Sequence, residues 1–200
     1  MRLIVCPPLK NAVAISCATL KAEGVICYPT DTLYGLGADA TNADACKKIS
    51  DIKKRGKNPY SVMFSDWKMA QEYVRLDESV KKMLEKITPG PFTFLLPAKK
   101  NLSASSSHLL GCRVPDNEFC LQICKKFGYP IVSTSANVSG EREATCAQEI
   151  DIDILNKVDL IVDGGRCEYS LGSTIIDVPA KKILRKGVGF ETAQKWLEKI

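Results

Sequence analysis

The chain has 200 residues, of which 45% are hydrophobic and 26% are charged, and its formal net charge is +5. These proportions are typical of globular proteins and exclude a disordered or fibrous chain. The length allows a full hydrophobic core without metal or disulfide staples, and we expect a single domain over residues 1–200. The small basic excess is compatible with nucleotide or RNA partners and identifies neither.

The chain carries nine cysteines but one histidine, His108. The cysteine count is odd and no Cys-x-x-Cys pair occurs, so a zinc site is not expected. We interpret most thiols as small buried hydrophobes in a reducing compartment. The first residues show no secretory leader pattern and no segment is apolar enough to span a membrane. The sequence thus predicts a cytoplasmic protein without a membrane partner.

Short apolar runs alternate with amphipathic stretches along the chain. Asn11 is placed to cap a helix, and Gly24 and Gly128 are placed to end helices. Helices are predicted at 11–23, 42–53, 67–74, 78–87, 117–127 and 190–200. Strands are predicted at 25–28, 61–64, 92–96, 112–114, 131–133, 160–162, 173–178 and 182–184. This mixing predicts an α/β sheet covered by helices.

The first polar segment, residues 29–37, follows a predicted strand. It contains Thr30, Asp31 and Thr32, and two glycines follow them. Such a turn could bind a small polar ligand, since glycine lets the backbone approach closely. It could equally be a strand-ending turn stabilised by its own hydroxyls.

The second polar segment, residues 53–59, ends a predicted helix and contains Lys53, Lys54 and Arg55. Cations at a helix C-terminus are favourable through the helix dipole, which by itself favours a solvated cap. The alternative is a phosphate clamp, because guanidinium and ammonium groups suit phosphate oxygens.

Two later segments also combine polar groups with apolar strands. Arg113 interrupts an apolar run and, if half-buried, needs an anion from the protein or from a ligand. Residues 133–140 place four hydroxyls and the Asn137 amide after a strand, which suits phosphate, ribose or an ordinary loop. Neither a nucleophile elbow nor a P-loop occurs, and His108 is interpreted as a surface residue.

Taken in order, these segments resemble the Sua5/YrdC/YciO family over about residues 11–187. The resemblance rests on residues 29–36 (Pro-Thr-Asp-Thr-Leu-Tyr-Gly-Leu), the Lys-x-Arg of residues 53–55, and residues 89–93, 113–114, 133–137 and 173–174. The length is similar to that of the short-form members, the threonylcarbamoyl-AMP synthases.

The resemblance implies a twisted mixed sheet with helices on one side and a large, concave, basic cavity. It implies a nucleotidyltransferase that condenses L-threonine, bicarbonate and ATP, with Mg²⁺, into threonylcarbamoyl-AMP and pyrophosphate. The product would serve tRNA threonylcarbamoyladenosine modification through a tRNA threonylcarbamoyltransferase complex. No protein nucleophile would be needed, since positioning and electrostatics suffice. Threonine contacts are implied for Thr30, Arg113 and Ser173, and ATP contacts for Lys53, Arg55, Ser135, Asn137 and Arg185.

Three positions depart from common family residues: Gly56, Met63 and Lys186. Two alternatives stay open within the fold, a YciO-type paralogue and a module that binds tRNA or double-stranded RNA. The intact Ser-Ala-Asn at residues 135–137 favours the synthase over the YciO branch, and the absence of an aromatic-rich RNA motif disfavours the RNA module.

Overall fold

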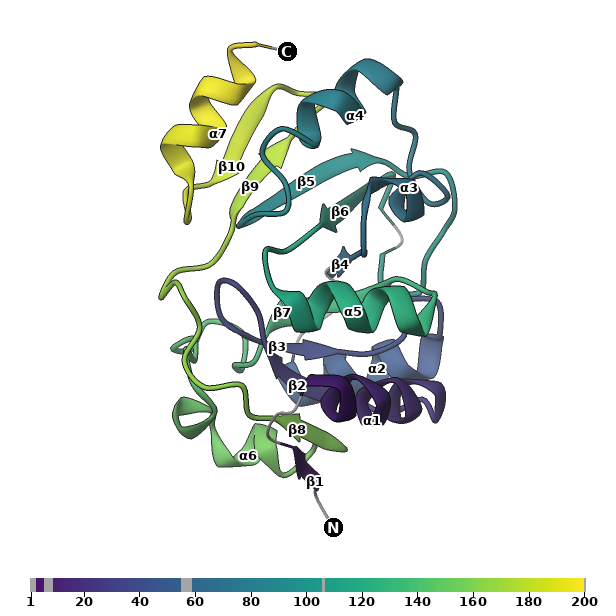
Figure 1. Ribbon diagram of the computed structural model, residues 1–200, viewed down its shortest axis with the longest axis vertical. Coiled ribbons are helices and arrows are strands. Elements are labelled where there is room, and N and C mark those ends of the chain that lie inside the picture. The colour runs from purple at the N-terminus through teal and green to yellow at the C-terminus, as the bar shows by residue number, and fades with distance from the viewer. Residues whose placement is uncertain (1–2, 6–8, 55–58, 106, 200) are drawn as a thin grey trace.

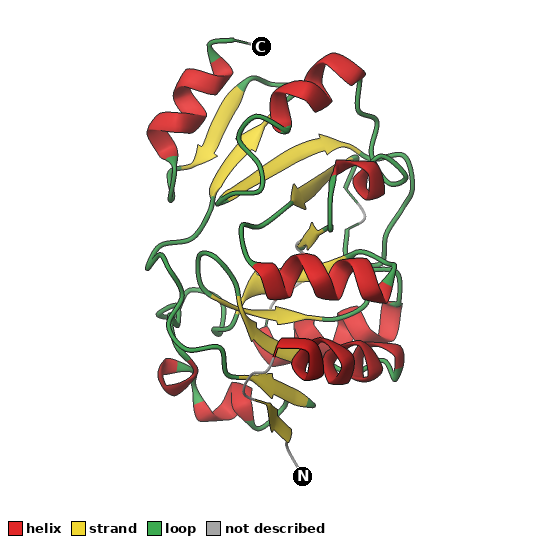
Figure 2. Cartoon of the chain, viewed as in Figure 1, coloured by secondary structure: helices red, strands yellow, loops and turns green. Residues whose placement is uncertain are grey.

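The computed structural model describes residues 3–5, 9–54, 59–105 and 107–199. Its helices and strands mix along the chain, as Figures 1 and 2 show. The helices are α1 (Leu9–Lys21), α2 (Ala43–Lys53), α3 (Trp67–Ala70), α4 (Glu78–Leu84), α5 (Glu118–Phe127), α6 (Ile152–Leu155) and α7 (Phe190–Leu197), with a 3₁₀ turn at Ala147–Glu149. The strands are β1 (Leu3–Val5), β2 (Ile26–Pro29), β3 (Tyr34–Gly37), β4 (Ser61–Met63), β5 (Phe92–Pro97), β6 (Leu109–Arg113), β7 (Ile131–Ser135), β8 (Leu160–Val162), β9 (Thr174–Asp177) and β10 (Lys182–Arg185).

The strands of the described residues form one mixed sheet in the order β1-β8-β2-β3-β7-β4-β6-β5-β9-β10. The sheet contains both parallel pairs, such as β5 with β9, and antiparallel pairs, such as β2 with β3. The sheet runs through the molecule from β1 near the N-terminus to β10 beside α7 (Figure 1). The predicted twisted mixed α/β sheet is therefore confirmed.

Buried residues fall into two clusters on opposite faces of this sheet. Ile26 and Tyr28 of β2 join the cluster that contains α1 and α5, whereas Val25 and Cys27 join the cluster that contains α2. Neighbouring residues of a strand point to opposite faces, so α2 packs on the face opposite to α1 and α5. The expectation of helices on one side only was wrong, because both faces of β2 are apolar and both need cover.

Helix ends follow the capping residues of the sequence closely. Asn42 accepts a hydrogen bond from Ala45 N and Asn117 accepts one from Cys120 N, as N-caps do. Gly128 ends α5 with φ 82°. The N-cap expected at Asn11 was wrong, since α1 already begins at Leu9.

Strand β3 was not predicted, because its sequence, Tyr-Gly-Leu-Gly, is half glycine. It pairs antiparallel with β2 and places Gly37 opposite Ile26. A Cβ atom at Gly37 would lie 2.8 Å from the Tyr28 ring, so the large side chain on β2 requires a glycine on β3. The segment read as a turn is thus a hairpin whose turn is only residues 30–33.

The thiols behave as expected from their apolar surroundings. The cysteines of the described residues are buried and unpaired: Cys17, Cys27, Cys46, Cys112, Cys120, Cys124, Cys146 and Cys167.

Within the described residues, no helix combines the length and the apolar character needed to cross a bilayer.

Candidate functional site

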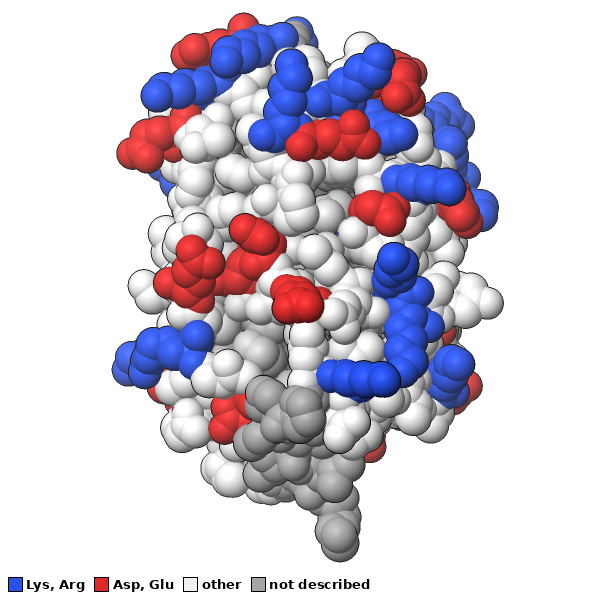
Figure 3. Space-filling model, in the orientation of Figure 1, with Lys and Arg blue, Asp and Glu red and all other residues white. Residues whose placement is uncertain are grey.

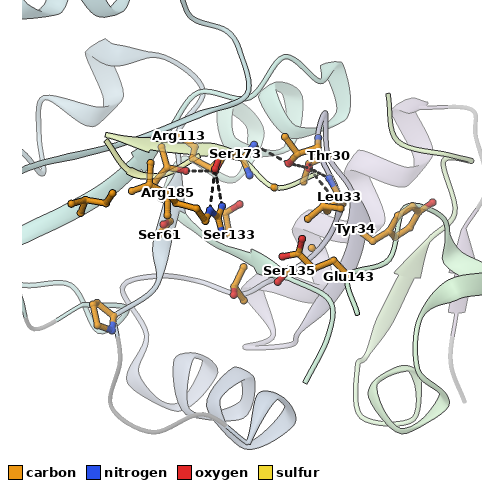
Figure 4. A pocket seen from close by; sticks show the side chains of 18 of the residues that line it. Thr30, Leu33, Tyr34, Ser61, Arg113, Ser133, Ser135, Glu143, Ser173 and Arg185 are labelled. Atoms are coloured by element: carbon orange, nitrogen blue, oxygen red, sulfur yellow. Dashed lines mark hydrogen bonds between the residues drawn. The ribbon is translucent and has the colours of Figure 1, made fainter. Parts of the chain in front are cut away.

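A cavity of about 350 Å³ opens on the sheet (Figure 4). Its lining comes from the β2–β3 turn, from β4, β5, β6, β7, β9 and β10, and from the chain around Glu143. Most of the lining side chains are polar: Thr30, Thr32, Ser61, Thr93, Arg113, Ser133, Thr134, Ser135, Glu143, Ser173 and Arg185.

Strand alternation explains why hydroxyls gather there. On β7, Ile131 packs under α1 and α5, and two residues further on Ser133 lines the cavity on the same face. On β4, Met63 is likewise covered, and Ser61, directly opposite Ser133, lines the cavity. The cavity therefore occupies the part of this face that α1 and α5 leave uncovered.

Thr30 shapes the turn that forms one wall of the cavity. Its hydroxyl donates to Leu33 O at 2.7 Å and accepts from the backbone N–H groups of Thr32 and Leu33. Thr30 lines the cavity as well, so the structural and the ligand-binding readings of this turn are compatible.

Arg113 is almost entirely buried and forms an ion pair with Asp31. Nη2 of Arg113 lies 2.8 Å from Oδ1 of Asp31, whose side chain has no exposed surface. The same Nη2 donates to the Thr32 hydroxyl at 3.2 Å, while Nε of Arg113 is buried without a hydrogen-bond partner. A buried donor without a partner is costly, and Arg113 lines the cavity. Arg113 thus has a structural counter-ion within the protein and still contributes positive charge to the cavity wall.

Arg185 forms a second cationic wall together with Ser173. Its Nε and Nη2 donate to Ser173 O at 3.1 and 2.9 Å, and Nη2 lies 3.2 Å from the Ser173 hydroxyl. That hydroxyl is also 2.7 Å from the hydroxyl of Thr93. Burial lowers the pKa of Arg185, and the positive charge of Arg113 adds to this, although an arginine remains protonated. Two guanidinium groups in one cavity favour an anionic ligand.

Lys53 lies beneath the chain that follows β7 rather than at the cavity wall. Its ammonium donates to the carbonyl oxygens of Ser135 and Asn137 and, at 3.1 Å, to Oδ1 of Asn137. Asn137 also accepts from the Ser135 hydroxyl at 2.6 Å and donates to Glu141 O at 2.6 Å. Lys53 and Asn137 therefore hold the segment that presents Ser135.

The structure brings together most of the residues proposed from the sequence. Those that line the cavity are Thr30, Arg113, Ser135, Ser173 and Arg185, whereas Lys53 and Asn137 lie outside the lining. Arg55 and Gly56 lie outside the described residues. Met63 is fully buried under α1 and α5, and His108 is exposed.

Three polar lining residues were not assigned to the site from the sequence: Ser61, Thr93 and Glu143. Period-two alternation with Met63 could have placed Ser61, and alternation with Phe92 and Phe94 could have placed Thr93. Glu143 follows a stretch without regular secondary structure, and no local sequence pattern predicts which way its side chain points. Within the described residues, no group of three or more metal-ligating side chains occurs, so the cavity contains no protein-built metal cage.

Comparison with known proteins decides the family. The Sua5/YciO/YrdC family model, described as "Telomere recombination", matches residues 18–187. The chain belongs to this family.

Two curated relatives carry synthase names. The chain is 38% identical over 173 residues to "Putative threonylcarbamoyl-AMP synthase" of Methanocaldococcus jannaschii, covering 84% of the chain and 82% of the relative. It is 32% identical over 185 residues to "Threonylcarbamoyl-AMP synthase" of Bacillus subtilis, covering 88% of the chain and 53% of that longer protein.

Two solved structures share the fold over nearly the whole chain. Sua5 of P. abyssi, crystallised with L-threonine, superposes with a TM-score of 0.89 at 26% identity, covering 100% of this chain and 62% of that one. YciO of E. coli gives a TM-score of 0.82 at 26% identity, covering 94% and 96%. The fold is thus common to the synthase and YciO branches, and the cavity must distinguish them.

Proposed function

We propose that this chain is an L-threonylcarbamoyladenylate synthase. The observation that carries the proposal is the pair of guanidinium groups, the buried Arg113 and the more exposed Arg185, in a cavity lined by hydroxyls. Such a site binds anions and neutral polar groups. The names of the two relatives and the threonine complex of P. abyssi Sua5 support the same conclusion.

The reaction that fits this cavity needs two anions close together. The amine of threonine and bicarbonate form a carbamate with loss of water, the carbamate oxygen attacks the α-phosphorus of ATP, and pyrophosphate leaves. Arg113 would bind the threonine carboxylate, with Thr30 and Ser173 beside it. Arg185 and Ser135 would contact the phosphates. The contribution of the protein is to hold these groups in line and to neutralise their charge.

Lys53 and Asn137 contribute in this scheme through the segment that they hold. By fixing the backbone of Ser135, they fix one wall of the phosphate site. Mg²⁺ would enter with ATP as part of the substrate, since Mg²⁺ usually keeps several waters and binds mainly through phosphates. The absence of a metal cage among the described residues suits this route.

A YciO-type activity is the main competitor within the fold, and RNA binding is the other. The face drawn in Figure 3 carries lysines and arginines interspersed with acidic groups rather than one basic surface. A net charge of +5 is also modest for an RNA-binding domain. These two observations favour the synthase over RNA binding, and the assay below separates it from a YciO-type activity.

The deciding experiment measures pyrophosphate release from ATP, Mg²⁺ and bicarbonate, with and without L-threonine. We expect release that depends on threonine, together with a threonylcarbamoyl-AMP product identified by mass spectrometry. An unchanged rate without threonine would reject the synthase. RNA binding without ATP, weakening steeply with added salt, would instead indicate an RNA module.

A further inference from the structure

The charges on the cavity wall are of both signs and are separated. Among the described lining residues, only Arg113, Arg185 and Glu143 are charged. Figure 4 shows Arg113 and Arg185 grouped with Ser173, whereas Glu143 lies beside Ser135 and points into the cavity. The cavity therefore presents both cationic and anionic side chains to a ligand.

Glu143 is half-buried and, within the described residues, its carboxylate takes part in no ion pair or hydrogen bond. It is close enough to Arg185 for its charge to oppose the lowering of the pKa of Arg185 that burial causes. The two groups nevertheless do not meet within 4.0 Å, and both line the cavity. A partly desolvated carboxylate with open space in front of it favours a cationic ligand group.

Resting on the proposed function, we propose that Glu143 binds the α-ammonium group of the amino-acid substrate. An α-amino acid enters as a zwitterion, with a carboxylate and an ammonium on adjacent atoms. The carboxylate would face the guanidinium groups while the ammonium faces Glu143. This deepens the synthase proposal by assigning a specificity-determining residue, because a hydroxy acid of the same shape lacks the group that Glu143 recognises.

The competing ligand is Mg²⁺ bound to ATP, which a lone carboxylate can also contact. Two features favour the ammonium. The described residues supply no second carboxylate to the cavity wall, and Glu143 neighbours hydroxyls that can share an ammonium's three donors. A charge-assisted hydrogen bond to an ammonium needs only one such acceptor.

The test combines one substitution with two ligands in isothermal titration calorimetry. L-Threonine is compared with (2S,3R)-2,3-dihydroxybutanoate, in which a hydroxyl replaces the amine. Glu143→Gln should weaken threonine binding about tenfold and leave binding of the hydroxy acid unchanged, since a hydrogen bond to a charged group is lost for one ligand only. Glu141→Gln is the matched control, because Glu141 is exposed in the same segment and does not line the cavity; it should change neither affinity.

The remaining outcomes separate the two proposals. An equal loss for both ligands, or none for either, overturns the role of Glu143 while leaving the synthase intact. A shift in the Mg²⁺ dependence of ATP binding with unchanged threonine affinity assigns Glu143 to the metal and also overturns it. If the unaltered protein binds no threonine, the proposed function itself fails, and the ammonium site fails with it.

Discussion

Asp31 and Arg113 form the buried ion pair on which one wall of the cavity depends, with Oδ1 of Asp31 2.8 Å from Nη2 of Arg113. The second oxygen of Asp31 accepts from Asp116 N at 3.3 Å, so the pair ties the β2–β3 turn to the chain after β6. The sequence could not show this, because the two residues are 82 positions apart.

Asp31→Asn should lower the free energy of unfolding by about 3 kcal/mol, because it leaves the buried Arg113 without its counter-ion. Urea denaturation measures this. Asp51→Asn serves as control: it removes an exposed ion pair with Lys47, with side chains 65% and 70% exposed, and should cost less than about 1 kcal/mol. Equal losses of stability in the two variants would show that the buried ion pair contributes no more to the free energy of unfolding than the exposed one.

Arg113→Gln should weaken threonine binding roughly tenfold or more and ATP binding much less, if the guanidinium meets the threonine carboxylate. This substitution also leaves the buried Asp31 without its counter-ion, so binding is compared with the double variant Asp31→Asn/Arg113→Gln, in which no charge is left unpaired. Threonine affinity should be low in the single variant and in the double variant. Recovery in the double variant, or equal loss of both ligands, would contradict the carboxylate role.

Lys53→Met distinguishes a loop support from a phosphate ligand. We expect unfolding to become easier by about 2–3 kcal/mol, since the carbonyls of Ser135 and Asn137 lose a charged donor. Lys54→Met, at the exposed neighbouring position, should change stability by less than about 0.5 kcal/mol. Lost ATP affinity with unchanged stability would restore the phosphate clamp proposed from the sequence.

Local signals in the sequence predicted what depends on near neighbours. The helices predicted at 42–53 and 117–127, the second closed by Gly128, were found because the pattern of each lies within its own few turns. Strand β3 escaped prediction, since its glycines are explained only by the Tyr28 ring on the adjacent strand.

The residues of the cavity also divide into those that local sequence predicts and those that depend on distant segments. Arg113 was identifiable as a polar group in an apolar strand, and its need for an anion was clear. Its actual partner, Asp31, and the inward direction of Glu143 depend on contacts between distant segments. The direction of the Lys53 side chain depends equally on the chain after β7.

Alkaline pH should destabilise the fold through its buried thiols. Burial raises the pKa of Cys27 from 9.0 to about 12, so above pH 9 the thiol ionises in the unfolded chain but not in the folded one. Stability present below pH 9 is then lost as pH rises toward 12, by about 1.4 kcal/mol per pH unit for this thiol. Urea midpoints at pH 7.5 and 10 test this, with Cys27→Ala expected to show a shallower pH dependence. Parallel profiles for the two proteins would exclude Cys27 as a source.

Gly187 permits the close approach that places Ser173 at the cavity wall. A Cβ atom at Gly187 would lie 2.5 Å from Ser173 O, a backbone atom that cannot turn away as a side chain could. Gly187→Ala should therefore displace Ser173, which anchors Arg185, with an overpacking cost of about 1–3 kcal/mol and weaker threonine binding. Lys182→Ala, exposed on the neighbouring strand β10, is the control and should change neither quantity. Because the strain lies next to the site, a loss of stability with full threonine affinity would show that Ser173 is not a substrate contact.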